Sequence, residues 1–221
     1  MVLLNTVHYI CIVNILNMGI TDRKEREKLE MKRRIIEAAM QMFLEEGYEK
    51  TSIRNIADKI EYSPGTIYLY YKDKDELLYE VQREAFGRLY EAFVQHAPSK
   101  SPWKRLEQMS HTYVNFGMEH PDLYDLMFII RAPMNTAEEK GGWVNGDACF
   151  NYLMECVAAC VDKKLLRYTD KRMAALSIWS LVHGLVSLNV RCRFKVMDME
   201  PEQINKALEM AVNEHLRLIK A

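Results

Sequence analysis

The strongest structural signal in this chain lies in residues 51–77, TSIRNIADKIEYSPGTIYLYYKDKDEL. This stretch holds two short segments with apolar residues at helical spacing, and a break separates them. Thr51 or Ser52 can cap the first segment, and Ser63 followed by Pro64 favours the start of a second helix. A short helix, a turn of about three residues and another short helix form a helix-turn-helix, so the stretch predicts that motif.

The residues on both sides extend this motif into a small domain. Upstream, an apolar stripe at helical spacing ends at Gly47, a residue type common at helix C-termini. Downstream, Asp73 and Glu76 form a capping-box pattern ahead of a long helix that reaches about Phe93. We therefore expect three helices over roughly residues 30–71, with a fourth helix leading out of the domain.

The rest of the chain also predicts helices. The fold class that we expect is all-α, with an N-terminal three-helix helix-turn-helix domain and a C-terminal helical domain. The expected elements after residue 100 are helices from Pro102 to about His120, from Pro121, from Asp147 to about Leu166, from Asp170 to about Arg193 and from 202 to about Ile219, with a loop-rich stretch at 131–146.

The composition is that of a helical globular protein, and together with the motifs it limits the kinds of functional site that we expect. Among 221 residues there are only 9 Gly and 6 Pro, too few for many hairpin turns. Because the formal net charge is −1, a DNA-binding surface would have to come from local clustering of cations. There is no GxSxG motif, glycine-rich phosphate loop or HExxH motif, so we expect no enzyme, no cofactor and no metal site.

The first 20 residues, MVLLNTVHYICIVNILNMGI, are apolar and need a separate interpretation. They lack the basic start and the small-residue cleavage site of a secretory signal, and three Asn make a membrane helix marginal. One expectation is that Met18 is the true start and that residues 1–17 are an upstream-start artefact. The alternatives are a helix packed on its own domain and a membrane-associated segment. On the first interpretation the protein is cytoplasmic and has no membrane partner.

The second short helix carries the residues that we expect to contact DNA. Small polar residues at its start let the backbone approach phosphate, and a helix N-terminus attracts anions. Because so short a helix can bury only one stripe, at least one of its tyrosines must face outward. The charged run at 21–34 is either a basic arm along phosphates or a solvated helix face. The predicted DNA-binding residues are Thr51, Ser52, Arg54, Ser63, Pro64, Gly65, Thr66, Tyr68, Leu69, Tyr70, Lys72 and Lys74.

The run from Ile35 to Leu78 resembles the DNA-binding domain of the TetR (tetracycline-repressor) family, and the similarity covers roughly residues 33–82. One departure is Glu61, where the family usually has glycine in the turn. If the backbone there is left-handed, a non-glycine residue costs on the order of 1 kcal/mol. The matching positions are Ala38-Ala39, Phe43, Gly47-Tyr48, Thr51, Ile53, Ile56-Ala57, Ser63, Gly65-Thr66, Tyr68, Tyr71, Lys74 and Glu76-Leu77.

Two segments of the C-terminal half, HPDLY at 120–124 and WSLVHGL at 179–185, are similar to ligand-binding domains of the same family. The resemblance implies a cavity for an unidentified inducer and a homodimer formed by the last two long helices. The candidate ligand-binding residues are Tyr113, Tyr124, Phe128, Phe150, Trp179 and His183. His183 can equally be a hydrogen-bonded core residue beside a close-packing Gly184.

The pattern of the last two long helices also favours a dimer. The helix at 170–193 is apolar on more than one face, which indicates burial on two sides. The predicted dimer-interface residues are Ile178, Leu181, Leu185, Leu208, Val212 and His215. Cys149, Cys156 and Cys160 share one helical face, where we expect small buried hydrophobes; a thiol sensor or a soft-metal site is the alternative.

These features predict three parts: an apolar extension at 1–20, a helix-turn-helix domain at 21–75 and a ligand-binding and dimerisation domain at 76–221. The expected function is that of a repressor that binds a pseudo-palindromic operator as a dimer and is released by a small apolar or aromatic inducer. A transcriptional activator of the same fold is the alternative. Because the helix from Lys74 to about Phe93 joins the two domains, we expect it to carry the response to the inducer.

Overall fold

The computed structural model describes residues 20–130, 133–141 and 146–221. Within these residues the structure is helical, and an isolated bridge between Leu166 and Lys220 is the one β contact. The all-α prediction is therefore confirmed. The elements are α2 (Ile20–Glu45), α3 (Ile53–Lys59), α4 (Pro64–Tyr68), α5 (Lys74–His96), α6 (Pro102–Glu119), α7 (Pro121–Tyr124), the π-helical turn η1 (Asp125–Ile129), α8 (Met134–Glu139), α9 (Asp147–Asp162), α10 (Lys171–Val190), the 3-10 turn η2 (Arg193–Met197) and α11 (Pro201–Ile219).

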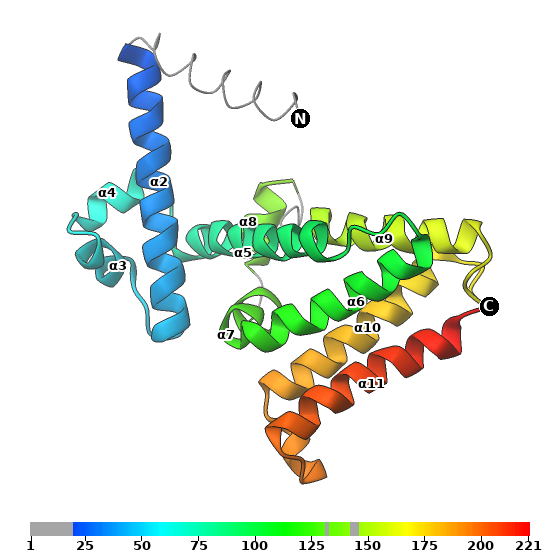
Figure 1. Cartoon of the computed structure of the whole chain (residues 1–221). Coiled ribbons are helices and arrows are strands. Elements are labelled where there is room, and N and C mark those ends of the chain that lie inside the picture. Colours follow the sequence, from blue (N-terminus) through cyan, green and yellow to red (C-terminus); the bar gives the residue numbers. More distant parts are fainter. Residues whose placement is uncertain (1–19, 131–132, 142–145) are drawn as a thin grey trace, which may run out of the picture.

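Helices α2, α3 and α4 form a group at one end of α5, which we call the reading head (Figure 1). Their shared core is apolar, and Ile35, Ile56 and Ile67 contribute one fully buried side chain from each helix. The first turn of α5 adds Leu77 and Leu78 to the same core. The reading head is therefore packed onto the start of α5.

The short helices begin where their capping residues predict. Ser52 caps α3, and its hydroxyl accepts a hydrogen bond from the backbone N–H of Asn55 at 3.2 Å. Ser63 caps α4 in the same way, through the N–H of Thr66 at 3.3 Å. The carboxylate of Asp73 caps α5. Each cap satisfies a backbone donor that has no partner inside the helix.

Two turns of the reading head have left-handed backbone. Gly47, after α2, has a φ of 88°, in agreement with the prediction of a C-terminal glycine. Glu61, in the turn between α3 and α4, has a φ of 62°. The structure thus places a non-glycine residue in a left-handed turn, at a cost on the order of 1 kcal/mol.

The remaining helices pack around α5 and α6, with α10 and α11 side by side on the side away from the reading head (Figure 1). A Cβ atom on Gly117 of α6 would lie 2.3 Å from Cγ1 of Val186 on α10, so glycine is what lets these two helices touch. Gly184, which we expected to pack closely, has no described atom within 4 Å of its Cβ position. That prediction is wrong within the chain.

Several boundaries differ from the sequence expectation. α2 begins at Ile20, because the charged run at 21–34 continues the helix instead of preceding it. The stretch 131–146, expected to be a loop, contains α8, and part of it lies outside the described residues. α9 ends at Asp162, about one turn early. Residues 1–19 lie outside the described part, so the interpretation of the apolar extension stays a prediction.

Candidate nucleic-acid interface and ligand cavity

The exposed surface of the reading head follows from how α4 packs. Ile67 is fully buried, and Tyr71, just after the helix, is 3% exposed. Tyr68 and Leu69 face outward, with 54% and 82% of their surfaces exposed. The expectation that a tyrosine faces outward is confirmed, and Tyr68 is the most exposed of the three.

Most of the predicted DNA-binding residues lie on the surface of α3, α4 and the turn between them. Polar groups around a helix start are suited to hydrogen bonds with phosphate oxygens, which position a protein on a duplex. Exposed residues are Ser52, Arg54, Ser63, Gly65, Tyr68, Leu69 and Lys72, and half-buried ones are Pro64, Thr66 and Tyr70.

Two of the predicted DNA contacts make hydrogen bonds inside the reading head, one from a buried and one from a half-buried side chain. Thr51 is 2% exposed, and its hydroxyl donates to the carbonyl of Gly47 at 2.9 Å. The Nζ of Lys74 donates to the carbonyls of Tyr48 and Thr51, at 2.9 and 3.2 Å, and lies 4.1 Å from the centre of the Tyr48 ring. Burial removes Thr51 from the surface, and its hydrogen bonds make Lys74 a link between α5 and the loop after α2. The assignment of Thr51 is corrected accordingly, and a DNA contact by the half-buried Lys74 stays a prediction.

A contact between α2 and the turn of the motif was missed by sequence reasoning. The guanidinium carbon of Arg34 lies 5.5 Å from the ring centre of Tyr62. From the sequence, Tyr62 was assigned only to the break between the two short helices. Tyr62 is 40% exposed, so this pair adds a cation and an aromatic edge beside α4. Farther up α2, Arg23 pairs with Glu27 at 2.8 Å, as on a solvated helix face.

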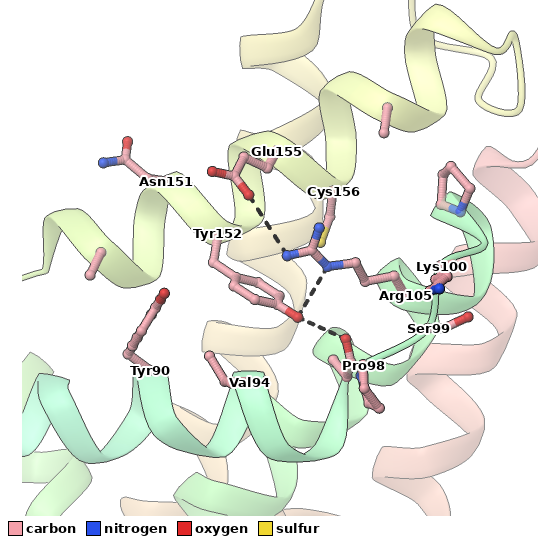
Figure 2. A pocket seen from close by; sticks show the side chains of 14 residues that line it. Tyr90, Val94, Pro98, Ser99, Lys100, Arg105, Asn151, Tyr152, Glu155 and Cys156 are labelled. Carbon is pink, nitrogen blue, oxygen red and sulfur yellow. Dashed lines mark hydrogen bonds and ion pairs between the residues drawn. The ribbon is translucent and has the colours of Figure 1, made fainter. Parts of the chain in front are cut away.

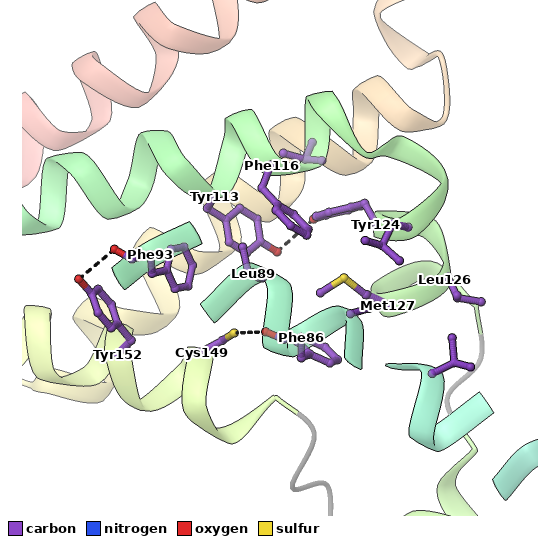
Figure 3. Packing of buried hydrophobic residues seen from close by; sticks show 14 of the residues in the cluster. Phe86, Leu89, Phe93, Tyr113, Phe116, Tyr124, Leu126, Met127, Cys149 and Tyr152 are labelled. Atoms are coloured by element: carbon purple, nitrogen blue, oxygen red, sulfur yellow. Dashed lines mark hydrogen bonds between the residues drawn. The ribbon is translucent and has the colours of Figure 1, made fainter. Parts of the chain in front are cut away.

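The C-terminal domain encloses a cavity of about 580 Å³ between α5, α6, α9 and α10, a size typical of small-molecule sites. In Figure 3, Phe86, Tyr113 and Cys149 approach one another from three of these helices. Five of the six predicted ligand residues line the cavity. The sixth, Tyr124, is not in the lining but forms hydrogen bonds with Tyr113 and His183, which are. The lining residues are Phe86, Leu89, Phe93, Met109, Tyr113, Met127, Phe128, Ile130, Gly146, Asp147, Cys149, Phe150, Leu153, Ile178, Trp179, Val182 and His183.

Three polar side chains meet at the wall of this cavity. The hydroxyl of Tyr124 lies 2.6 Å from Nδ1 of His183, and the hydroxyl of Tyr113 lies 3.2 Å from the same nitrogen. The two hydroxyls are 3.1 Å apart. Burial raises the pKa of both tyrosines and lowers the pKa of His183, so the cluster is uncharged at neutral pH. The sequence left the role of His183 open, and the structure shows it both hydrogen-bonded and at the cavity.

The thiols of α9 behave as apolar groups. Cys149 donates to the carbonyl of Phe86 at 3.3 Å, and burial raises the pKa of its thiol to about 12. Burial also raises the pKa values of Cys156 and Cys160, each to about 11. Thiols that stay protonated are poor nucleophiles and poor metal ligands, which favours the expectation of buried small hydrophobes.

A second pocket, of about 540 Å³, opens at the surface between α5, α6 and α9 (Figure 2). Arg105 lines this pocket. Its guanidinium donates to the hydroxyl of Tyr152 at 3.1 Å and pairs with Glu155 at 3.7 Å. Tyr152 donates in turn to the carbonyl of Ala97 at 2.8 Å. Arg105 is thus already paired, and these contacts hold the three helices together.

Ion pairs join the end of α8 to the first turns of α5. The Nζ of Lys140 lies 3.1 Å from Oε1 of Glu76 and 2.9 Å from Oε1 of Glu80. Lys72, just before α5, pairs with Glu139. We call these five residues the α8 latch. It connects the C-terminal domain to the segment directly behind the reading head.

Half of the predicted dimer-interface residues belong to the core of the single chain. Ile178, Leu208 and Val212 are 2% exposed or less. A buried side chain offers no surface to a second chain, so their assignment to an interface is corrected. The other three, Leu181, Leu185 and His215, are half-buried.

α10 nevertheless keeps an apolar surface on its outer side. Met173, Ser177, Leu181, Gly184 and Leu188 recur every three or four residues and are exposed or half-buried, so they form one stripe, which we call the outer stripe. Among the described residues α10 is the one helix long and apolar enough to cross a membrane by composition alone, with a mean hydropathy of 1.5. It packs against α6, α9 and α11, so some of its apolar side chains belong to the core of the chain. The apolar side chains of the outer stripe do not.

Comparisons with known proteins agree for both halves of the chain. Residues 35–81 match the family of bacterial regulatory proteins named tetR, and residues 106–214 match the tetracyclin repressor-like C-terminal domain. The first match falls on the reading head and the start of α5, and the second covers α6 to most of α11.

Curated relatives are similar over part of their length. The fatty acid metabolism regulator protein of Bacillus subtilis (strain 168) is 33% identical over 70 residues, which is 32% of this chain and 36% of the relative. The HTH-type transcriptional repressor KstR of Rhodococcus jostii (strain RHA1) is 26% identical over 90 residues, or 41% of this chain and 42% of the relative. The matched part thus spans between a third and a half of the length of these relatives.

Solved structures share the fold over nearly the whole chain. A TetR family transcription regulator from Marinobacter aquaeolei VT8 has a TM-score of 0.63 at 22% identity, covering 88% of this chain and 98% of that one. The transcriptional regulator FadR from Bacillus subtilis, solved in complex with stearoyl-CoA, has a TM-score of 0.64 at 20% identity, covering 83% and 96%. With the two family matches lying on the reading head and on the helices around the cavity, this chain belongs to the TetR family of bacterial regulatory proteins.

Proposed function

We propose that this regulator is a repressor whose reading head binds operator DNA through α4. The observation that carries the proposal is the exposed pair Tyr68 and Leu69 on a helix anchored by Ile67. A phenol can donate to a phosphate or a base edge, and an apolar side chain can contact a thymine methyl group. Arg54, exposed on α3, adds a cation for the phosphate backbone.

The proposed repressor is a homodimer in which α10 and α11 face the same helices of a second copy. The outer stripe supports this arrangement, because an apolar face of this length is usually covered. The open space beside Gly184 would let a partner helix approach closely. Two reading heads would then enter successive major grooves, about one helical turn (~34–36 Å) apart, on a pseudo-palindromic operator.

The cavity is the proposed site for an inducer, a small apolar molecule that releases the repressor from DNA. Its lining is almost wholly apolar and aromatic. The relatives favour a fatty-acyl compound among apolar ligands, because one is named a fatty acid metabolism regulator and a structure of similar fold was solved with stearoyl-CoA.

The proposed coupling to DNA runs from the cavity to the first turns of α5. Phe86 of α5 and Phe128 of η1 both line the cavity, with ring centres 5.1 Å apart. α5 continues to the reading head, and η1 leads to α8 and the α8 latch. A ligand shifts this equilibrium only by its differential affinity for the two states. Coupling of ~1–3 kcal/mol would lower operator affinity about 5–150-fold.

Sequencing the DNA fragments that the purified full chain selects tests the proposed function. We expect an enriched pseudo-palindrome. Tyr68→Ala should lower the affinity for that fragment about tenfold without lowering Tm, because it removes a surface contact only. Tyr90→Ala, at an exposed tyrosine of α5, is the matched control and should bind like the unaltered chain. No enriched sequence, or equal affinity of all three proteins, would contradict the proposal.

An activator with the same reading head is the second candidate, and the family resemblance favours neither direction of control. Transcription from a promoter that carries the selected sequence distinguishes the two, since a repressor lowers the transcript level when it binds. Because the proposed target is DNA, we expect a cytoplasmic location. Membrane partitioning of the full chain against a chain that starts at Met18 tests the membrane-associated alternative.

A further inference from the structure

We propose that the cavity selects a ligand with an uncharged carbonyl group, such as an ester or thioester, over the free carboxylate, through the Nε2–H of His183. The proposal rests on the ligand-responsive function above and adds the chemistry of the ligand's polar end. Two independent features of the described residues carry it: the tautomer of His183 and the charge of the cavity wall.

The hydrogen bonds at Nδ1 determine the tautomer of His183. The hydroxyl of Tyr124 approaches this nitrogen at 2.6 Å, and the hydroxyl of Tyr113 lies 3.2 Å from it. The hydroxyl of Tyr124 has one proton and also lies 3.3 Å from the backbone carbonyl of His183. We assign the proton to the shorter contact, because a phenol is a stronger hydrogen-bond donor than a neutral imidazole, so Tyr124 donates and Nδ1 accepts. A neutral imidazole carries one proton, and that proton therefore sits on Nε2.

The Nε2–H group has no partner among the described residues. Every side-chain hydrogen bond of His183 ends on Nδ1. The imidazole lines the cavity beside Phe128 and Trp179, with ring centres 5.4 and 6.1 Å from its own. A donor surrounded by aromatic rings gains most from an acceptor that the ligand itself brings.

The charge of the wall selects among acceptors. The described lining contains no Lys or Arg, and Asp147 is its one carboxylate. A ligand carboxylate would lose its hydration, find no cation among the described lining residues and lie near the carboxylate of Asp147. Burial lowers the pKa of His183, so the imidazole does not supply the missing cation at neutral pH. A carbonyl oxygen accepts the same N–H bond and loses much less on leaving water.

The test compares three probes of similar chain length on the full chain: methyl dodecanoate, dodecanoate and tridecane. Calorimetry near neutral pH, below the micelle concentration of the acid, should show the ester binding about tenfold more tightly than the other two. Equal affinity of ester and acid, or tighter binding of the acid, would overturn this inference and leave the cavity as a ligand site. If no probe binds, the inference and the proposed ligand site both fail.

Variants separate the hydrogen bond from the shape of the cavity. His183→Phe keeps a ring and removes the N–H, so the ester should bind only as tightly as tridecane. His183→Gln keeps a side-chain N–H and should recover part of the preference. Phe150→Leu alters the wall without altering a donor, and the ratio of ester to acid affinity should not change. Thermal unfolding confirms that each variant is folded. Nitrogen NMR of the histidine ring must report the Nε2–H tautomer, and the Nδ1–H form would overturn the inference.

Discussion

Lys74 illustrates how a side chain suited to phosphate can also link two parts of a DNA-binding domain. Its Nζ lies between the carbonyls of Tyr48 and Thr51 and over the Tyr48 ring. The hydroxyl of Tyr48 donates to Asp75. Burial and the contact with Asp75 raise the pKa of Tyr48, so its hydroxyl stays protonated as a donor. Two neighbouring contacts thus tie the first turn of α5 to the loop after α2.

We expect Lys74→Met to lower the free energy of unfolding by about 1–3 kcal/mol, because two carbonyls lose a charged donor while the apolar stem is kept. Lys72→Met is the matched control. Its amine makes an ion pair between exposed side chains, so its removal should cost much less than the removal of the Lys74 amine. Urea unfolding measures both values. If the two variants were equally stable, Lys74 would not be a structural link.

α8 shows how a very short helix depends on its neighbours. Its six residues, Met134–Glu139, are too few for a stable helix in isolation, so contacts with α5 must hold it. Glu76 is the centre of those contacts. Burial opposes ionisation of Glu76, but hydrogen bonds from the backbone N–H of Lys72 and from Lys140 outweigh it, and the pKa of Glu76 is lowered. The α8 latch therefore works with Glu76 ionised.

Lys140→Met should loosen the first turns of α5 without unfolding the protein, because it removes the shared cation of Glu76 and Glu80. Amide hydrogen exchange over residues 74–80 should become severalfold faster, whereas Lys104→Met, an exposed lysine on α6, should leave these amides unchanged.

The effect should also depend on pH. A carboxyl with a lowered pKa stabilises the fold at pH values above its unfolded-state pKa of about 4.3, and it loses that effect as the pH falls through its folded-state pKa. The difference between variant and unaltered chain should accordingly shrink in acid, and a constant difference would argue against the latch.

The arrangement of α10 gives the molecule an inner and an outer apolar face. Inward, Val186 lies against Gly117 of α6, and Ile178 is fully buried. Outward, the outer stripe is exposed or half-buried in the single chain, with Leu188 45% exposed and Ser177 accepting a hydrogen bond from Tyr168. Such a division is expected of a helix that serves both a core and an assembly.

Leu181→Glu should convert the proposed dimer into folded monomers, because it places a charge in the middle of the outer stripe. Val94→Glu, an exposed apolar residue of α5, is the control and should stay dimeric. Analytical ultracentrifugation measures the mass of each, and circular dichroism checks the helical content. A charge at Leu208 would test folding instead, since that side chain is 2% exposed. A dimeric Leu181→Glu variant would place the interface elsewhere.

Local chemistry made much of this protein predictable from the order of its residues. Caps such as Ser52, Ser63 and Asp73 act within one helical turn, so their neighbours along the chain suffice to locate the helix starts. The outward direction of Tyr68 followed from the single stripe that a short helix can bury. Five cavity residues were also predicted, but the expectation of a cavity came from the resemblance to the TetR family.

Contacts between distant segments set the remaining features. Thr51 looked available for DNA until packing in three dimensions buried it, and Lys74 turned out to bind carbonyls of the loop after α2. α8 was hidden in a loop-rich stretch because its partners lie on α5. Ile178 is buried in the core of the single chain, whereas part of the Leu181 side chain remains exposed to solvent. The physical reason is the same in each case: a helix face buried against one partner is lost to any other, and which face is buried depends on neighbours that meet it only in three dimensions.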